Sequence, residues 1–185
     1  MIIKMATFTN QIKISLTVFS LMFTLFGCSN EETPKQGINT MTTFDLVDFF
    51  SGNTRGSGFV QDRSGEIIRT FEVITVGDFN NDAGTLKETF SWNDGEVENR
   101  TWTLKRISEN EWSGTAPDVI GTATGTINND KLRWSYTLTL KVGGKKINLK
   151  FDDQMWMSET GVMVNHAKFS KFGLHLGDVV VSFHK

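Results

Sequence analysis

The stretch Phe90-Ser-Trp-Asn-Asp-Gly-Glu-Val-Glu-Asn-Arg-Thr-Trp102 predicts a β-hairpin. Apolar and polar side chains alternate on both of its sides, which is typical of strands with one buried face. Between these runs lies Asn93-Asp94-Gly95, and Asp-Gly is among the strongest short-range signals for a tight turn. We therefore expect two antiparallel strands to be joined at this point.

The length of the loop follows from which side chains should share a face. A slip of one residue would turn every side chain of a strand to the opposite face. A three-residue loop, with Gly95 in the left-handed conformation, opposes Leu86 to Trp102. The same register opposes Glu88 to Arg100. The hairpin then has one apolar face that contains a carboxylate opposite a guanidinium.

Length and composition are typical of one globular domain. The chain has 185 residues, of which 38% are hydrophobic and 22% are charged. It contains 17 glycines and only two prolines, which suits many turns between unbroken strands. The formal net charge is −2, so there is no electrostatic signature of nucleic-acid binding.

The same alternation recurs along the rest of the chain, most clearly over 131–142. A two-residue turn at Gly143-Gly144 pairs this run with the next and opposes Trp134 to Asp153. A turn at Asn129-Asp130 sets Gly125 against Trp134 on the other side. A small residue opposite a large aromatic one is what a closely curved sheet requires.

These runs predict an all-β fold of about 8–10 antiparallel strands over residues 44–185. So long a meander would expose its edges unless it closed, so we expect an up-and-down β-barrel of the lipocalin or calycin kind. A two-sheet sandwich is the second choice. The segment 44–50 is either one helical turn that plugs a barrel end or the first strand.

The first 27 residues have the features of a secretory signal. Lys4 and Lys13 precede an apolar run over 14–26, which ends at Gly27-Cys28. The run is too short for an ordinary transmembrane helix. A buried amphipathic helix is the alternative, but the segment is apolar on every face.

Leu25-Phe26-Gly27-Cys28 resembles the lipobox of bacterial lipoproteins. The resemblance implies that residues 1–27 are removed, that Cys28 is acylated, and that 28–43 is a tether between the lipid anchor and the barrel. Ser29 implies, again by resemblance, the outer membrane of a Gram-negative cell and a periplasm-facing domain.

Several polar side chains fall on the predicted inner face: Arg69, Glu88, Glu98, Arg100, Asp153 and Asn165. Unpaired charges inside a barrel are very unfavourable, so these groups must be paired or hydrated. They form either an ion-pair network that fixes the register or the polar floor of a ligand cavity, in which Arg100 or Arg69 meets an acidic headgroup.

Aromatic side chains on the inner face are either core or the wall of an adaptable apolar pocket. The candidate ligand-binding residues are therefore Arg69, Glu88, Arg100, Trp102, Trp134, Tyr136, Asp153 and Asn165. The three histidines have no zinc-like spacing, and the sequence contains no nucleophile elbow and no phosphate loop. We expect no metal or cofactor and assign no catalytic residue.

A string of short motifs resembles a family of proteobacterial lipoproteins that is known only as a domain of unknown function. The motifs are Phe71, Glu88-x-Phe90, Asp94-Gly95-Glu96, Arg100-x-Trp102, Ala116-x-Asp118-x-x-Gly121-x-Ala123-x-Gly125, Trp134-x-Tyr136, Phe151-Asp152-Asp153-x-Met155 and Asn165-x-Ala167-x-x-x-Lys171-Phe172-Gly173. Genes of this family often lie beside genes that modify membrane fatty acids, including cyclopropane synthases. This association implies a lipid-related role but no mechanism.

Three functions remain open at this stage. The first is a lipid-anchored module whose barrel binds a fatty acyl or other apolar ligand. The second is a lipid-modifying enzyme that uses Glu88, Arg100 and Asp153 as its acid–base set. The third is a structural or assembly partner in the cell envelope, which would need a contiguous exposed apolar patch.

Overall fold

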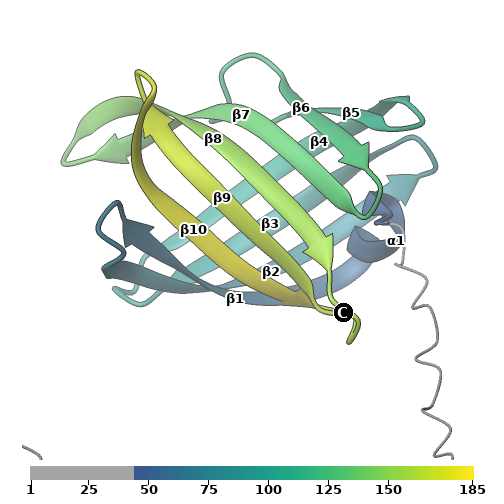
Figure 1. Ribbon diagram of the computed structural model, residues 1–185, viewed down its shortest axis with the longest axis horizontal. Helices are drawn as coiled ribbons and strands as arrows, with labels where there is room; N and C mark the ends of the chain where they lie inside the picture. Colours follow the sequence, from purple (N-terminus) through teal and green to yellow (C-terminus); the bar gives the residue numbers. More distant parts are fainter. Residues whose placement is uncertain (1–43) are drawn as a thin grey trace, which may run out of the picture. The chain divides into compact units, whose positions relative to one another are not determined.

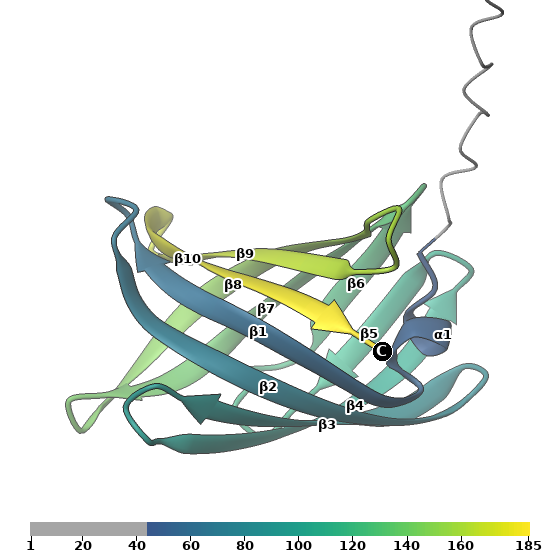
Figure 2. The same cartoon turned by 90° about the horizontal axis from the view of Figure 1, so that it is seen from below.

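The computed structural model describes residues 44–185, which form a closed antiparallel barrel (Figures 1 and 2). The expectations for the signal segment 1–27, for Cys28 and for the tether 28–43 lie outside the described residues. Within 44–185, no helix is long and apolar enough to cross a membrane.

Ten strands and one short helix make up the described chain. The elements are α1 (Leu46–Phe50), β1 (Gly52–Asp62), β2 (Ile67–Asn80), β3 (Ala83–Trp92), β4 (Val97–Ser108), β5 (Glu111–Thr115), β6 (Ala123–Asn128), β7 (Lys131–Val142), β8 (Lys145–Met157), β9 (Met163–Lys171) and β10 (Leu174–His184). Each strand pairs with its neighbours in the sequence, and β1 pairs with β10 to close the sheet. The predicted all-β, up-and-down barrel is confirmed.

The predicted registers are also confirmed. Leu86 opposes Trp102 and Glu88 opposes Arg100 across β3 and β4, and Gly95 has a φ of 88° in the connecting turn. On the other side of the barrel, Trp134 of β7 opposes Asp153 of β8. The alternation of apolar and polar residues was therefore sufficient to set these strands in phase.

A glycine allows the sheet to curve tightly beside Trp134. Gly125 of β6 opposes this tryptophan, as the sequence predicts. A Cβ atom built on Gly125 would lie 2.3 Å from Cε3 of Trp134, which is too close for any side chain. The missing side chain leaves the space that the indole ring occupies.

Helix α1 covers one end of the barrel, beside the C-terminus (Figures 1 and 2). The Asp45 side chain caps the helix and accepts a hydrogen bond of 2.9 Å from the backbone N–H of Asp48. Leu46, Phe49 and Phe50 are buried in the main core. Of the two expectations for segment 44–50, the helical turn at a barrel end is the correct one.

The two ends of the barrel differ in what covers them: helix α1 lies over one end, and within residues 44–185 no helix lies over the other. Inward-facing residues near α1, such as Leu86 and Leu104, are buried. Toward the opposite end, inward-facing Phe71 and Leu138 are buried, while Phe90, Trp92 and Val179 are half-buried. We call this second end the open end. It carries the turns between β1 and β2, β3 and β4, β7 and β8, and β9 and β10.

Strands β5 and β6 are much shorter than their neighbours. Strand β4 pairs with β5 only from Thr103 onward, so its residues 97–102 have no strand on that side. The connecting loop 116–122 lies there instead. The backbone N–H of Thr139 donates to the carbonyl of Asp118 and that of Ile120 to the carbonyl of Thr137, both at 2.8 Å, which holds the loop against β7.

Candidate functional site

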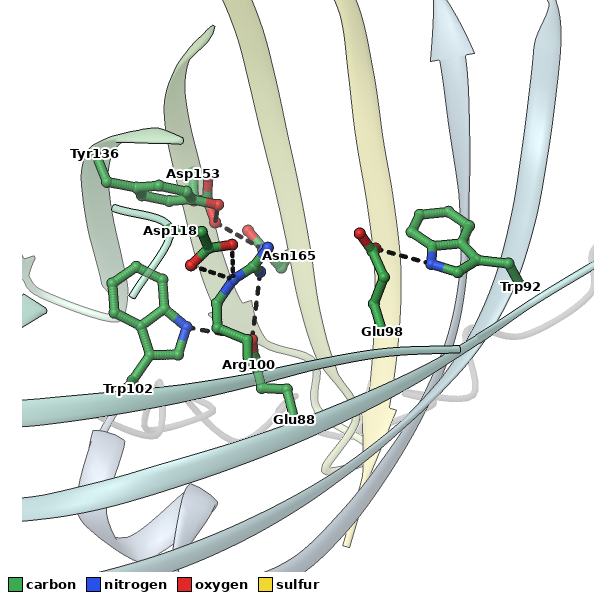
Figure 3. A network of polar contacts seen from close by, with 9 residues as sticks. All are labelled: Glu88, Trp92, Glu98, Arg100, Trp102, Asp118, Tyr136, Asp153 and Asn165. Carbon is green, nitrogen blue, oxygen red and sulfur yellow. Dashed lines mark hydrogen bonds and ion pairs between the residues drawn. The ribbon is translucent and has the colours of Figure 1, made fainter. Parts of the chain in front are cut away.

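A set of polar side chains crosses the inside of the barrel between its two apolar clusters (Figure 3). We call this set the polar belt. Its members come from β3, β4, the loop 116–122, β7, β8 and β9, and they are Glu88, Arg100, Asp118, Tyr136, Asp153 and Asn165. Residues up to 77 positions apart in the chain, Glu88 to Asn165, therefore meet in one place.

Arg100 holds the first half of the belt together. Its Nε donates to both oxygens of Asp118, at 2.9 and 3.2 Å, and its guanidinium lies 3.4 Å from Oε2 of Glu88. The Nε1 of Trp102 donates to the same Glu88 oxygen at 3.2 Å. The exposed fractions of the side chains are 15% for Arg100, 14% for Glu88 and 33% for Asp118. The predicted acid–base pair is present, but the closer partner of Arg100 is Asp118.

The sequence did not single out Asp118 as a site residue. It lies in the loop after β5, where the alternation of a strand no longer says which way a side chain points. The hydrogen bonds between this loop and β7 bring the carboxylate to Arg100, and they join residues that are about twenty positions apart. The only prior indication was the presence of Asp118 among the family motifs.

Asp153 anchors the second half of the belt. Its Oδ2 accepts from Asn165 Nδ2 at 3.0 Å and from the Tyr136 hydroxyl at 3.4 Å. Its Oδ1 and the Oδ1 of Asn165 are both buried and have no hydrogen-bond partner. Asp153 is only 5% exposed, and this burial raises its pKa to about 7 in spite of the two hydrogen bonds.

Burial also sets the protonation of the other belt members. It raises the pKa of Glu88 above its ordinary value, and the charge of Arg100 and the indole of Trp102 offset only part of that rise. It raises the pKa of Tyr136 well above its ordinary value, so the phenol stays neutral. Burial alone would lower the pKa of Arg100, but the neighbouring Glu88 and Asp118 raise it, so the guanidinium stays charged.

Aromatic rings line the barrel beside the belt. Trp102 lies edge-on to Trp134 at 5.8 Å between ring centroids and edge-on to Tyr136 at 5.4 Å. Tyr136 in turn stacks on Phe151 at 5.2 Å. The expectation that these tryptophans share one enclosed face is confirmed. Trp134 is buried, whereas the edge of Tyr136 reaches the polar groups.

Arg69 lies apart from the belt. It forms two hydrogen bonds with Asp94, at 2.7 and 2.8 Å, and one with Glu96 at 2.5 Å, and it covers the ring of Trp92 at 3.9 Å. These partners belong to the turn between β3 and β4, at the open end. The structure therefore brings seven of the eight candidate residues together and leaves Arg69 at the rim.

Glu98 forms a second polar pair inside the barrel. Its Oε2 accepts from Nε1 of Trp92 at 2.9 Å, and Figure 3 shows this pair separated from the belt. Within residues 44–185, no group of histidine, cysteine and acidic side chains has a geometry that could hold a metal ion.

Comparison with known proteins places the chain in a family. The sequence profile of the family described as "Protein of unknown function (DUF3833)" matches residues 22–185. The chain belongs to the DUF3833 family. No curated protein matches the sequence. The expected membership of a family of unknown function is thus confirmed, while the lipoprotein character of this DUF3833 chain stays a prediction.

Solved structures show that the DUF3833 barrel is lipocalin-like. The S-type phycobiliprotein lyase CpeS from Guillardia theta superposes with a TM-score of 0.55 at 7% identity, over 75% of this chain and 89% of the lyase. A protein of unknown function from the DUF3598 family of Nostoc punctiforme gives 0.53 at 13% identity, over 79% of this chain and 51% of that one. At these identities the likeness concerns the fold alone.

The outer wall of the DUF3833 barrel carries a shallow depression of about 470 Å³ near the open end. The residues around it are Thr137, Asn148, Lys150, Asp152, Ser170, Lys171, Phe172 and Gly173. Asp152 accepts from Lys150 and from Ser135 at 2.8 Å each, so its charge is already compensated. This surface is separate from the polar belt, because Asp152 and Asp153 are adjacent on β8 and point to opposite faces.

Proposed function

We propose that this protein binds a small amphiphilic ligand with a fatty acyl or similar apolar chain inside the barrel, and that the ligand enters through the open end. The observation that carries the proposal is the partial exposure of Glu88 and Arg100. Both side chains point inward from adjacent strands, so solvent reaches the inside of the barrel at the level of the polar belt. Ligand sites inside barrels are mostly apolar and contain a few polar groups that orient the ligand.

The wall above the belt suits an apolar chain. Phe90, Leu140, Ile147, Phe169 and Val179 are inward-facing or packed on the inner clusters, yet all are only half-buried. Such side chains gain by further burial, at about 25 cal/mol for each Å² removed from water. An acyl chain that lies against them would supply this burial.

The rim of the open end supports a ligand that comes from a lipid phase. Six of the ten exposed large hydrophobic residues within 44–185 lie at the turns of this end: Ile67, Ile68, Val97, Val142, Phe172 and Leu174. Phe172 is 98% exposed. Exposed apolar side chains around a barrel rim are suited to contact with lipid or with another protein.

We also propose the location that the sequence indicates. Acylation of Cys28 would hold the barrel at the outer membrane, on the periplasmic side, through the tether 28–43. Mass spectrometry of the mature protein from the membrane fraction should find a chain that begins at an acylated Cys28. An unprocessed Met1, or release of the protein with the soluble fraction, would contradict this location.

Two measurements test ligand binding. Native mass spectrometry of the protein from its own host should detect a retained lipid. In addition, Val179→Phe narrows the inside of the barrel, whereas Val180→Phe adds the same bulk to the opposite face of β10 and serves as the matched control. Titration with an alkyl ligand, followed by the change in tryptophan fluorescence, gives the affinity. This affinity should fall about tenfold or more in the first variant and stay unchanged in the second.

The outcome that contradicts the proposal is specific. The inside of the barrel is not a binding site if no lipid is retained and alkyl ligands do not change the tryptophan fluorescence. The same conclusion follows if the two variants bind an alkyl ligand with equal affinity. The ion pairs of the belt would then serve only to fix strand register.

A further inference from the structure

The inside of the barrel contains more acidic than basic groups. Four carboxyl groups face it, from Glu88, Glu98, Asp118 and Asp153, and the belt holds one guanidinium, that of Arg100, which binds Glu88 and Asp118. Glu98 accepts from Trp92 instead, and Asp153 from Asn165 and Tyr136. Arg69 contributes nothing to this balance, because Asp94 and Glu96 already bind it at the rim. Arg100 is the one cationic side chain of the polar belt and is already paired, so an arriving anion would find no unpaired positive charge there.

Two acceptor oxygens in the belt have no donor. They are Oδ1 of Asp153 and Oδ1 of Asn165, the free oxygens of two side chains that are already joined by a hydrogen bond between Asn165 Nδ2 and Asp153 Oδ2. Asp153 is more than nine-tenths buried. A buried acceptor without a partner is costly, so a group that supplies N–H or O–H donors at this point would be stabilised.

We propose that the polar end of the bound ligand is a cationic hydrogen-bond donor, such as a primary ammonium, which binds the free oxygens of Asp153 and Asn165. This inference rests on the proposed function, since it names the chemistry of the ligand that the barrel takes. It also excludes a free carboxylate as the preferred headgroup.

The arginines explain why a carboxylate is disfavoured. Arg100 is bound by Asp118 at 2.9 Å and by Glu88 at 3.4 Å, so an anionic headgroup could reach it only by displacing one of them. The displaced carboxylate would then lose its own partner inside the barrel. A cation meets no competing donor, because the two free oxygens accept from nothing else. Both oxygens are buried, so neighbouring side chains must shift to admit the cation.

Charge distinguishes an ammonium from a neutral alcohol. The titratable groups that face Asp153 are Tyr136 from β7, Glu88 from β3 and Arg100 from β4, and its neighbour on β9 is the neutral Asn165. Since the pKa of Asp153 is about 7, a bound cation should lower it and expel the proton. Affinity for an ammonium should therefore rise between pH 6 and pH 8, whereas affinity for an alcohol should not.

A matched set of probes tests this chemistry with the intact protein. Decylammonium, decanol and decanoate share one chain and differ in their headgroups, and an alkylammonium stays charged from pH 6 to pH 8. Calorimetry at pH 8 should show that decylammonium binds about tenfold or more tightly than decanoate. Asp153→Asn should weaken binding of decylammonium about tenfold and binding of decanol much less, because the asparagine keeps an acceptor oxygen but carries no charge. Asp152→Asn, on the outer face of β8, is the control and should change neither.

Each outcome decides the question. Decanoate that binds as tightly as decylammonium, or affinity for decylammonium that is flat from pH 6 to pH 8 in the unmodified protein, would overturn the inference while the barrel remained a binding site. The pH series needs no variant, so it stays decisive even if Asp153→Asn folds poorly. If none of the three probes binds, the proposed function fails together with the inference.

Discussion

Replacing Arg100 by alanine is the most direct test of how the inside of the barrel is held together. The change leaves Glu88 inside the barrel without its cation, while Asp118, which is 33% exposed, can be hydrated. Removal of one partner from a buried ion pair costs about 3–5 kcal/mol. Glu88 can limit this cost by taking up a proton. Protonation of a carboxylate costs about 1.36 kcal/mol for each pH unit above its pKa. With the ordinary pKa of 4.5 for Glu88, the uptake of a proton at pH 7 therefore costs about 3.4 kcal/mol.

Urea unfolding followed by tryptophan fluorescence measures this effect. We expect Arg100→Ala to lower the free energy of unfolding by about 3–5 kcal/mol at pH 7. The stranded Glu88 has a raised pKa, so the penalty is largest above that pKa and falls as the pH is lowered toward 4.5. At pH 5 the part due to protonation should be below about 1 kcal/mol.

Two further variants show whether the stranded charge is the cause. Glu88→Gln on the Arg100→Ala background removes the charge and should recover a large part of the loss at pH 7. Lys150→Ala breaks an exposed pair with Asp152 and should cost no more than about 1 kcal/mol. An unchanged urea midpoint in Arg100→Ala, or a penalty that does not depend on pH, would refute the reasoning.

Three other changes have expected outcomes. Burial raises the pKa of Asp153 to about 7, so ionisation opposes folding, and stability should fall as the pH rises from about 4 to about 7. Asp153→Asn should remove that part of the slope in urea melts, and an unaltered slope would place the titration elsewhere. Gly125→Ala puts a methyl group against the ring of Trp134 and should lower the free energy of unfolding by about 1–3 kcal/mol, whereas a neutral effect would mean that the ring can move. Asp118→Ala removes the closer partner of Arg100 and should lower the free energy of unfolding by about 1–3 kcal/mol. This loss should be smaller than that of Arg100→Ala, because Glu88 remains paired with Arg100. An equal loss would show that Asp118 alone holds the guanidinium.

Much of the barrel could be predicted because strand phase is a local property. Side chains in a strand alternate between two faces, so the turn at Gly95 and the alternation around it suffice to place Glu88 opposite Arg100. The same argument placed Gly125 against Trp134. Closure into a barrel also followed, because a long meander leaves costly edges unless it closes.

The position of Arg69 at the rim could not be predicted from strand phase. Its position in β2 gives it the phase of an inward residue, but phase does not say how far along the barrel a side chain lies. It lies at the open end, where the acidic turn between β3 and β4 binds it first. Distance along the barrel axis depends on the tilt and stagger of all the strands together.

What the amino-acid sequence determined by itself is the set of strands, their turns and the side chains that face inward, since each depends on neighbours that are near in the chain. Only the tertiary structure decided which inward groups meet. Asp118 reaches Arg100 because short β5 and β6 leave room for a loop that hydrogen-bonds to β7. Asp153 and Asn165 keep two oxygens free because no donor from another strand reaches them. These contacts join residues that are distant in the chain. The alternation of side chains along a strand shows which face a residue is on, but not which distant residue it will contact.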